Sequence, residues 1–182
     1  MRFFTSDLHF SHKKIIEFCN RPWPDVESMN QGLIDRWNET VSDDDDIFCL
    51  GDMFFCGTTQ AKEIMSKLKG RKYLIQGNHD WKRVRSDRGL EFGFDWVQKH
   101  QHQVRIANEE VLLCHFPYDG DHTHDVRFLE MRPLDYGGWL LHGHVHCAWK
   151  VKERQINVGV DVWDFKPVPE SALEEIIKTP LF

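Results

Sequence analysis

Long apolar runs and a surplus of one charge are both missing from this chain of 182 residues. No stretch approaches the roughly 20 apolar residues of a membrane span, so we expect no membrane-spanning segment. The net charge of −6 is mild, and Lys and Arg are interspersed with acids. We therefore expect no extended footprint for nucleic acid. An acid as early as Asp7 argues against a secretory signal, and we expect a cytoplasmic protein.

Cysteine pairs are missing as well. The five cysteines are odd in number and form no Cys-x-x-Cys motif. This pattern argues against a disulfide framework or a zinc finger and favours a reducing compartment. Histidine, in contrast, is abundant, with 11 residues.

The first half of the chain alternates apolar runs with amphipathic segments. We expect strands at 1–5, 47–50 and 72–76, and helices at 12–19, 27–41 and 59–69. Such alternation predicts right-handed crossovers between parallel strands. After the third strand, residues 81–94 are expected to form a short helix and a loop.

The second half is rich in strands with short turns between them, and we expect an antiparallel sheet there. The predicted strands lie near 97 and at 103–106, 111–114, 139–141, 148–151 and 156–160. We also expect a helix around 126–131, within an irregular segment at 116–133, and a closing helix at 171–178. Both halves together predict one α/β domain over residues 1–182, built from two packed mixed β-sheets with helices outside.

Polar side chains suited to metal binding follow five of the predicted strands. They are Asp7 and His9, Asp52, Asn78, His115, and His144 with His146. Functional groups in open α/β architectures gather outside the carboxyl ends of strands, which brings ligands distant in sequence together. Within Asp7-x-His9 and His144-x-His146, the spacing of two would put both side chains on one side of an extended strand.

The ligand set exceeds what one metal ion needs. Two carboxylates, four imidazoles and one amide make seven donors, whereas a single zinc site takes four. Seven donors fit two metals about 3.5–4 Å apart that share a carboxylate. The mixture of nitrogen and oxygen favours Mn, Fe, Zn, Co or Ni over Mg and Ca. We expect two divalent transition-metal ions, with Mn favoured.

In their order along the chain, these motifs resemble the calcineurin-like metallophosphoesterase superfamily. The blocks are Asp-x-His, Gly-Asp, Gly-Asn-His-Asp, a single His and Gly-His-x-His. Any one block is weak evidence, but five in order are specific. The resemblance implies a double β-sandwich flanked by helices and a hydrolase that acts on phosphate esters.

The resemblance also implies a role for each residue. Asp7, His9 and His146 would hold the first metal, Asn78, His115 and His144 the second, and Asp52 would bridge them. His79 would sit over the scissile phosphate as the catalytic acid, with Asp80 orienting its ring. The alternative for Asp80 is to cap the helix that follows it. A hydroxide formed from a bridging water would attack the phosphorus.

The motifs define the reaction class more narrowly than the particular phosphate ester. The second block reads Gly51-Asp52-Met53-Phe54-Phe55. It lacks the Asp-Arg-Gly that follows in the superfamily's protein phosphatases, which disfavours a Ser/Thr protein phosphatase. No long insertion supplies a cap, so an open site for phosphodiesters such as small cyclic nucleotides is favoured. A phosphomonoesterase or nuclease is the alternative within the superfamily. A non-catalytic metal-binding scaffold is the alternative of another class.

Further candidates border these motifs. His12 and Arg21 follow the first motif and are predicted to bind the substrate phosphate, with a surface or fold-holding role as the alternative. His142 is expected either to contact and support the ligands without binding metal or to be structural. In the 116–133 segment, three side chains could line the substrate cleft or simply be solvated: His122, His124 and Arg127. After the last predicted strand of the second sheet, Asp161 and Trp163 could close the floor of the site or pack in the core.

Overall fold

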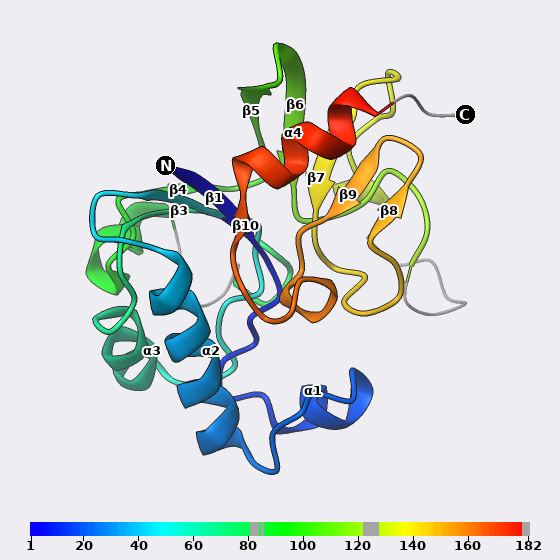
Figure 1. Cartoon of the computed structure of the whole chain (residues 1–182). Coiled ribbons are helices and arrows are strands. Elements are labelled where there is room, and N and C mark those ends of the chain that lie inside the picture. The colour runs from blue at the N-terminus through cyan, green and yellow to red at the C-terminus, as the bar shows by residue number, and fades with distance from the viewer. Residues whose placement is uncertain (81–83, 85, 122–127, 180–182) are drawn as a thin grey trace.

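The computed structural model describes residues 1–80, 84, 86–121 and 128–179 (Figure 1). Its strands are β1 (Arg2–Thr5), β2 (Asp46–Cys49), β3 (Arg71–Ile75), β4 (Trp96–Gln98), β5 (Gln101–Ile106), β6 (Glu109–Cys114), β7 (Trp139–His142), β8 (Val151–Lys152), β9 (Gln155–Asn157) and β10 (Val168–Pro169). Its α-helices are α1 (Lys13–Phe18), α2 (Val26–Thr40), α3 (Thr58–Met65) and α4 (Glu170–Lys178). Three 3₁₀ turns complete it: η1 (Ser86–Phe92), η2 (Leu129–Met131) and η3 (Val160–Val162).

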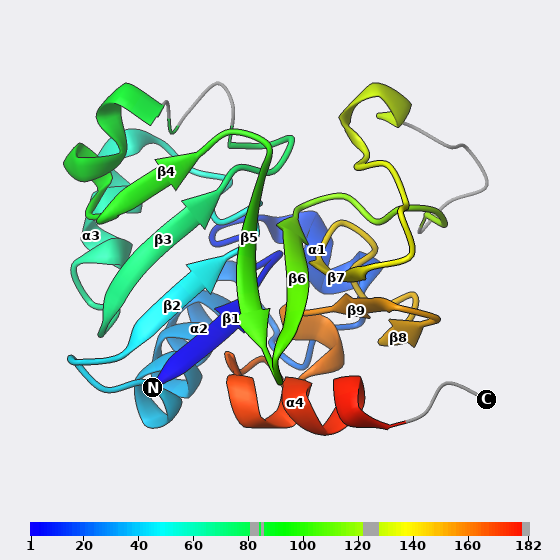
Figure 2. The ribbon, with the colours of Figure 1, turned by 90° about the horizontal axis from the view of Figure 1, so that it is seen from above.

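The first sheet has the strand order β10-β1-β2-β3-β4. Figure 2 shows β1 to β4 side by side, and Figure 1 shows β10 beside β1. Strands β1 to β4 run parallel, with Phe3 opposite Ile47 and Phe48 opposite Tyr73. Only β10 is antiparallel to its neighbour in this sheet. The parallel arrangement predicted from the alternation of apolar and amphipathic segments is confirmed. It places the carboxyl ends of β1, β2 and β3 side by side.

The second sheet has the order β5-β6-β7-β9-β8 and is mixed. The pairs β5–β6 and β8–β9 are antiparallel, as expected, but β6–β7 and β7–β9 are parallel. The prediction of an antiparallel sheet was therefore wrong for these two pairs. The segments 115–138 and 143–154 are long enough for the chain to return before pairing again. As a result, the carboxyl ends of β6 and β7 lie at the same edge.

The two faces of the first sheet pack against different partners. Phe3 and Ile47 face α2 and α3, whereas Phe4 and Leu50 point into the layer between the two sheets. This alternation follows the two-residue period of strands. Helix α2 contributes Leu33 and other apolar residues of one face, and the side chain of its N-cap Asp25 accepts a hydrogen bond from the amide of Ser28. Two mixed sheets flanked by helices, as predicted, are confirmed.

Some element boundaries differ from the predictions. Helix α3 ends at Met65, before the predicted end at Lys69, although Leu68 remains buried. Residues 148–150 are not part of β8, and the predicted helix around 126–131 is one 3₁₀ turn where it is described. Within the described residues, no helix combines the length and the apolar character needed to cross a membrane.

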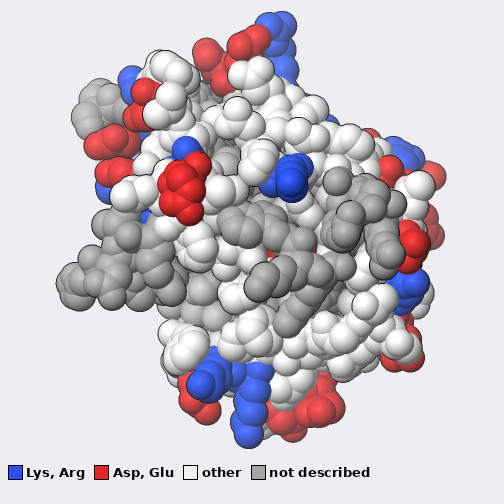
Figure 3. All heavy atoms as spheres, turned by 180° about the vertical axis from the view of Figure 1, so that it is seen from behind, with Lys and Arg blue, Asp and Glu red and all other residues white. Residues whose placement is uncertain are grey.

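Charged side chains of both signs lie around the periphery of the face shown in Figure 3. Neither sign gathers into a continuous patch on the described part of that face. A broad basic stripe is the electrostatic mark of a duplex-binding surface. This face therefore offers no such stripe among the described residues.

Candidate metal centre

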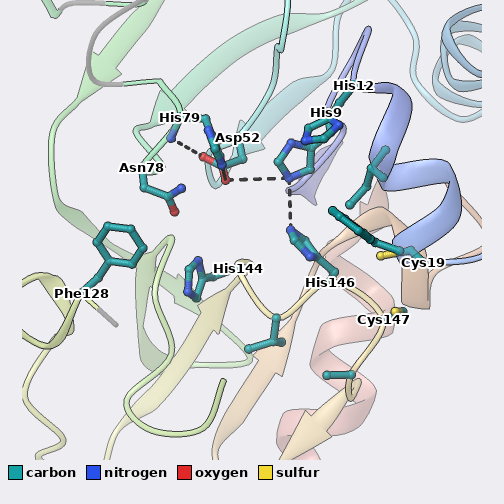
Figure 4. A pocket seen from close by; sticks show the side chains of 14 residues that line it. His9, His12, Cys19, Asp52, Asn78, His79, Phe128, His144, His146 and Cys147 are labelled. Carbon is teal, nitrogen blue, oxygen red and sulfur yellow. Dashed lines mark hydrogen bonds and ion pairs between the residues drawn. The ribbon is translucent and has the colours of Figure 1, made fainter. Parts of the chain in front are cut away.

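The carboxyl ends of five strands meet at one place, and backbone hydrogen bonds hold them together. The Asp7 amide donates to the Gly51 carbonyl at 3.1 Å, which ties the end of β1 to the end of β2. The Gly143 amide donates to the His115 carbonyl at 3.0 Å, which ties the end of β7 to that of β6. Around this junction the structure brings together the seven predicted ligands, Asp7, His9, Asp52, Asn78, His115, His144 and His146. Figure 4 labels His9, Asp52, Asn78, His144 and His146 among them.

The first group comprises Asp7, His9 and His146, whose ligand atoms all lie within 4.8 Å of one another. The Nε2 atoms of His9 and His146 are 3.1 Å apart. The Oδ1 atom of Asp7 lies 3.6 Å from the His146 Nε2 and 3.8 Å from the His9 Nε2. Imidazole nitrogens that bind one ion at about 2.0–2.1 Å in a tetrahedral arrangement are about 3.3 Å apart. These separations are those of ligands to one ion.

The second group comprises Asn78, His115 and His144, and it is less compact. The Asn78 Oδ1 lies 3.1 Å from the His115 Nε2. The His144 ring packs edge-on against the His115 ring with centroids 5.3 Å apart. Its Nε2 faces the Oδ1 of Asp121 at 3.6 Å. Asn78 and His115 thus already meet, whereas His144 lies at the edge of the group.

Asp52 lies between the two groups. Its Oδ2 is 3.5 Å from the His115 Nε2 and 3.8 Å from the His9 Nε2. The same oxygen is 3.9 Å from the Nε2 of His79. Its other oxygen accepts a hydrogen bond from the His79 amide at 2.9 Å, which fixes the carboxylate. This is the position that a bridging carboxylate needs.

The buried side chains of the first group suit a divalent cation. Asp7 is fully buried, and its Oδ1 has no hydrogen-bond partner among the described residues. Burial raises the pKa of Asp7 to about 7. Burial, with His146 beside it, lowers the pKa of His9 well below 6.5 and keeps that ring neutral. A buried carboxylate oxygen without a hydrogen-bond donor, beside neutral imidazoles, is costly unless a proton or a cation neutralises it, and the neighbouring imidazoles suit a divalent transition metal.

The backbone aims these side chains in a way that the sequence did not indicate. Strand β1 ends at Thr5 and β7 at His142, so neither the Asp7-x-His9 pair nor the His144-x-His146 pair lies on a strand. The expected strand geometry was wrong. Instead, five ligand residues have a left-handed backbone, with φ of 56°, 49°, 54°, 69° and 48° at Asp7, His9, Asp52, His144 and His146. Positive φ is uncommon outside glycine, and it clusters at functional sites.

Two glycines of the motifs allow the carboxylates to approach the backbone. A Cβ at Gly77 would lie closer than 3.0 Å to the side chain of Asp52. A Cβ at Gly143 would lie closer than 3.0 Å to the side chains of both Ser6 and Asp7. The φ of Gly77 is not positive, so close packing against Asp52, rather than a left-handed turn, explains glycine at this position.

Arg21 is not a substrate-binding residue in this structure, which corrects the prediction. Its guanidinium is buried and donates to both carboxylate oxygens of Asp161, at 2.8 and 2.9 Å. It also donates to the backbone carbonyls of Leu8 and Asp7, both at 2.8 Å. Arg21 therefore has the alternative, fold-holding role and fixes the loop that carries Asp7 and His9. Asp161 lies beneath this loop as its partner.

Asp80 also differs from its predicted role. Its carboxylate accepts hydrogen bonds from the amides of Asp52 at 2.7 Å, Gly77 at 2.9 Å and Met53 at 3.3 Å. Burial raises its pKa, and these amides oppose the shift. Asp80 thus joins the loops after β2 and β3, whereas we expected it to orient the His79 ring.

The His79 side chain itself reaches the pocket and is 40% exposed. His12 lines the same pocket, and its ring centroid lies 5.4 Å from that of His9 and 4.0 Å from that of Phe55. His12 remains a candidate for substrate binding. His142 is buried against Trp149 with ring centroids 4.6 Å apart, and burial lowers its pKa to about 3, as a structural residue requires.

One acidic residue near the site was missed. Asp121 approaches the His144 ring from outside the motifs, and the Arg132 Nη2 lies 3.0 Å from its Oδ2. No motif marks it, since it follows His115 in an irregular segment. Of the loop candidates, His122, His124 and Arg127 lie outside the described residues. Trp163 donates from its indole nitrogen to the Asn157 carbonyl and packs with the inter-sheet core, the alternative expected for it.

A pocket of about 510 Å³ opens above the ligands (Figure 4). Candidate ligand residues line its middle, and His12, His79, Phe128, residues of α1 with Cys19, and residues 145–148 line the rest. Its volume is within the range of small-molecule sites, about 300–1,000 Å³. It therefore has room for more than a single phosphate group.

The fold and the site define an α/β protein with a candidate metal centre at the carboxyl ends of its strands. No family model matches the chain. It is 32% identical to the uncharacterized protein MJ1445 of Methanocaldococcus jannaschii, over 97% of this chain and 90% of that protein. It is 37% identical to the gene 66 proteins of Mycobacterium phages L5 and D29, over 88% and 92% of this chain and 86% and 92% of those proteins. The chain belongs to the family of these proteins.

A solved structure shares the fold. It is the crystal structure of the protein of unknown function AQ665 from Aquifex aeolicus, with a TM-score of 0.74. The match covers 97% of this chain and 98% of that chain at 24% identity. At this identity the likeness shows the fold alone.

Proposed function

We propose that this protein is a dinuclear-metal-dependent phosphoesterase of the calcineurin-like metallophosphoesterase superfamily, with the double β-sandwich fold of that superfamily. The observation that carries the proposal is the convergence of seven candidate ligands from five strand ends, with Asp52 between the other six. Their order along the chain is the order of the superfamily's motifs.

The two groups would hold two divalent transition-metal ions, with Mn favoured and Fe, Zn, Ni or Co as alternatives. The first group offers one carboxylate and two imidazoles, and the second offers an amide and two imidazoles. Bound there, the ions supply Lewis acidity and a nucleophile at neutral pH. Asp52, between the groups, would serve both.

His79 is the proposed catalytic acid. Its ring lines the pocket, and its Nε2 lies 3.9 Å from the Asp52 Oδ2, beside the central carboxylate. From there it can donate a hydrogen bond to a phosphate oxygen or a proton to the leaving group. Positioned general acids contribute about 10²–10⁴-fold to rate. Phosphodiesters, including small cyclic nucleotides, are the favoured substrates. A monoesterase, a nuclease and a non-catalytic scaffold remain the alternatives.

A screen of metals against substrates tests the proposal. The protein is stripped with a chelator and reloaded with Mn, Fe, Zn, Ni or Co. It is then assayed with bis-p-nitrophenyl phosphate, p-nitrophenyl phosphate, and 2′,3′- and 3′,5′-cyclic nucleotides. We expect hydrolysis that requires metal and is faster on the diesters.

His79→Ala should retain metal, by elemental analysis, and lose about 10²–10⁴-fold in turnover. His100→Ala, a change at an exposed histidine, is the matched control and should be unaffected. Wild-type turnover in metal-loaded His79→Ala would refute its role. Two bound ions without hydrolysis of any ester would favour the scaffold.

A further inference from the structure

Apolar side chains line one end of the pocket. Ile15 and Phe18 come from α1, and Val145 and Ala148 come from the segment after β7. We call these four residues the α1 wall. Val145 directly precedes His146, so the wall adjoins the first group. The wall lines the same pocket as five of the candidate ligands, His9, Asp52, Asn78, His144 and His146.

The wall has a fixed base and an exposed upper part. Ile15 and Val145 are 1% and 0% exposed, and Ile15 is packed into the core between α2 and the first sheet. Phe18, in contrast, is 68% exposed although it lines a concave site. A single exposed aromatic on a convex surface needs no explanation. Within a pocket, it offers apolar area that a bound molecule can cover.

The other end of the pocket is marked by Phe128. Its ring centroid lies 5.7 Å from that of His144, in the second group. Figure 4 shows Phe128 on one side of the ligands and Cys19 and Cys147 on the other. The ligands therefore occupy the middle. A phosphate held there directs its organic group toward one of the two ends.

We propose that the α1 wall is a binding subsite for a flat apolar group, an aryl ring or a nucleobase, carried by the phosphate ester. Phe18 is the residue that determines this specificity, because its exposed ring can pack against such a group. The inference rests on the proposed function, since it takes the phosphate to bind between the two groups. It narrows the substrate class to esters of aromatic or nucleoside alcohols.

Calorimetry with two phosphonates tests the subsite without turnover. Phenylphosphonate and methylphosphonate carry the same anionic group and differ in the ring. With Mn-loaded protein, phenylphosphonate should bind about tenfold more tightly, from the apolar area that the ring buries. Phe18→Ala should reduce this preference to about twofold. Leu90→Ala, a change at a residue 79% exposed that does not line the pocket, is the control and should keep the preference.

Each result decides the question. Equal affinity of the wild-type protein for both phosphonates would overturn the subsite, and hydrolysis of bis-p-nitrophenyl phosphate would then show that the proposed function stands. An unchanged preference in Phe18→Ala would overturn the role of Phe18. Failure of both phosphonates to bind, without hydrolysis of any ester, would overturn the proposed function and the subsite together.

Discussion

The two ligand groups differ in how completely the fold assembles them. In the first, the Nε2 atoms of His9 and His146 are 3.1 Å apart with the Asp7 carboxylate beside them. In the second, only Asn78 and His115 meet at a comparable distance, and the His144 Nε2 faces an acid instead. Ligands that are already in place lower the cost of binding. We expect the first group to bind its ion more tightly.

The difference has a structural cause. The loop that carries Asp7 and His9 is fixed from below by the buried Arg21–Asp161 pair. The His144 ring instead lies beside Asp121, which comes from the segment between β6 and β7. A loop held by a buried ion pair and two hydrogen bonds to its carbonyls keeps its side chains in place before an ion binds.

The largest expected effect on metal content and turnover comes from removing Asp52, between the two groups, and is compared with removing His144 from the second group. Asp52→Ala should lose both ions and reduce turnover about 10³-fold, since the central carboxylate serves both groups. His144→Ala should retain about one ion, because it leaves the first group intact. Elemental analysis after desalting measures the stoichiometry. A His144→Ala protein without any ion would show that the first group does not bind alone.

Arg21→Ala should be the most destabilising change beneath the first group. It leaves the buried carboxylate of Asp161 without its partner, which typically costs about 3–5 kcal/mol. Urea unfolding of the metal-free protein measures the loss. Arg71→Ala breaks the exposed pair with Asp46 and is the control, with a much smaller effect. Equal losses of unfolding free energy in the two variants would show that burial does not increase the contribution of the Arg21–Asp161 pair.

Gly143→Ala should weaken the first group without unfolding the protein. The new methyl group would displace Asp7, and a shift of this kind is expected to lower metal affinity about 10–100-fold. Gly57→Ala is the matched control, because a Cβ there meets nothing within 4 Å among the described residues. Titration calorimetry with Mn gives both affinities. If Gly143→Ala binds Mn as the wild type does, the tight packing is not required.

The smallest expected effect concerns pH. Burial raises the pKa of Asp7 from 3.8 to about 7, so the folded, metal-free protein holds this proton more tightly than the unfolded chain does. The contribution of Asp7 to the free energy of unfolding therefore falls as pH rises from about 4 to about 7. Asp7→Asn removes this contribution. Relative to wild type, the variant should be more stable at pH 7.5 than at pH 5 in urea unfolding with chelator; the opposite order would contradict the shift.

The sequence indicated the ligands because each follows an apolar run that becomes a strand. Periodicity and motif order placed Asp52 and Asn78 at strand ends, and the parallel first sheet brings these ends together. Strand pairing in the second sheet was not predictable, because loop length alone does not decide whether a returning strand is parallel. The parallel pair β6–β7 is nevertheless what places His115 beside His144.

Contacts between distant residues were also beyond the sequence. Arg21 pairs with a residue 140 positions later, and nothing in the local pattern of either one indicates it. Asp80 follows His79 directly, which favoured a role on that ring, yet its carboxylate bonds backbone amides of two loops. In each case the tertiary structure decides which of several possible partners a polar group takes.

The left-handed backbone at five ligand residues bears on how this protein would evolve. Such a conformation costs roughly 1–3 kcal/mol at a residue other than glycine. Asp, His and Asn tolerate it better than most residues, so the same types serve both the backbone and the chemistry. A selection for thermal stability alone, with activity no longer required, would replace these residues by glycine first. Under the proposed function, the strain at the strand ends is a trade-off in which stability is lost so that the side chains can meet.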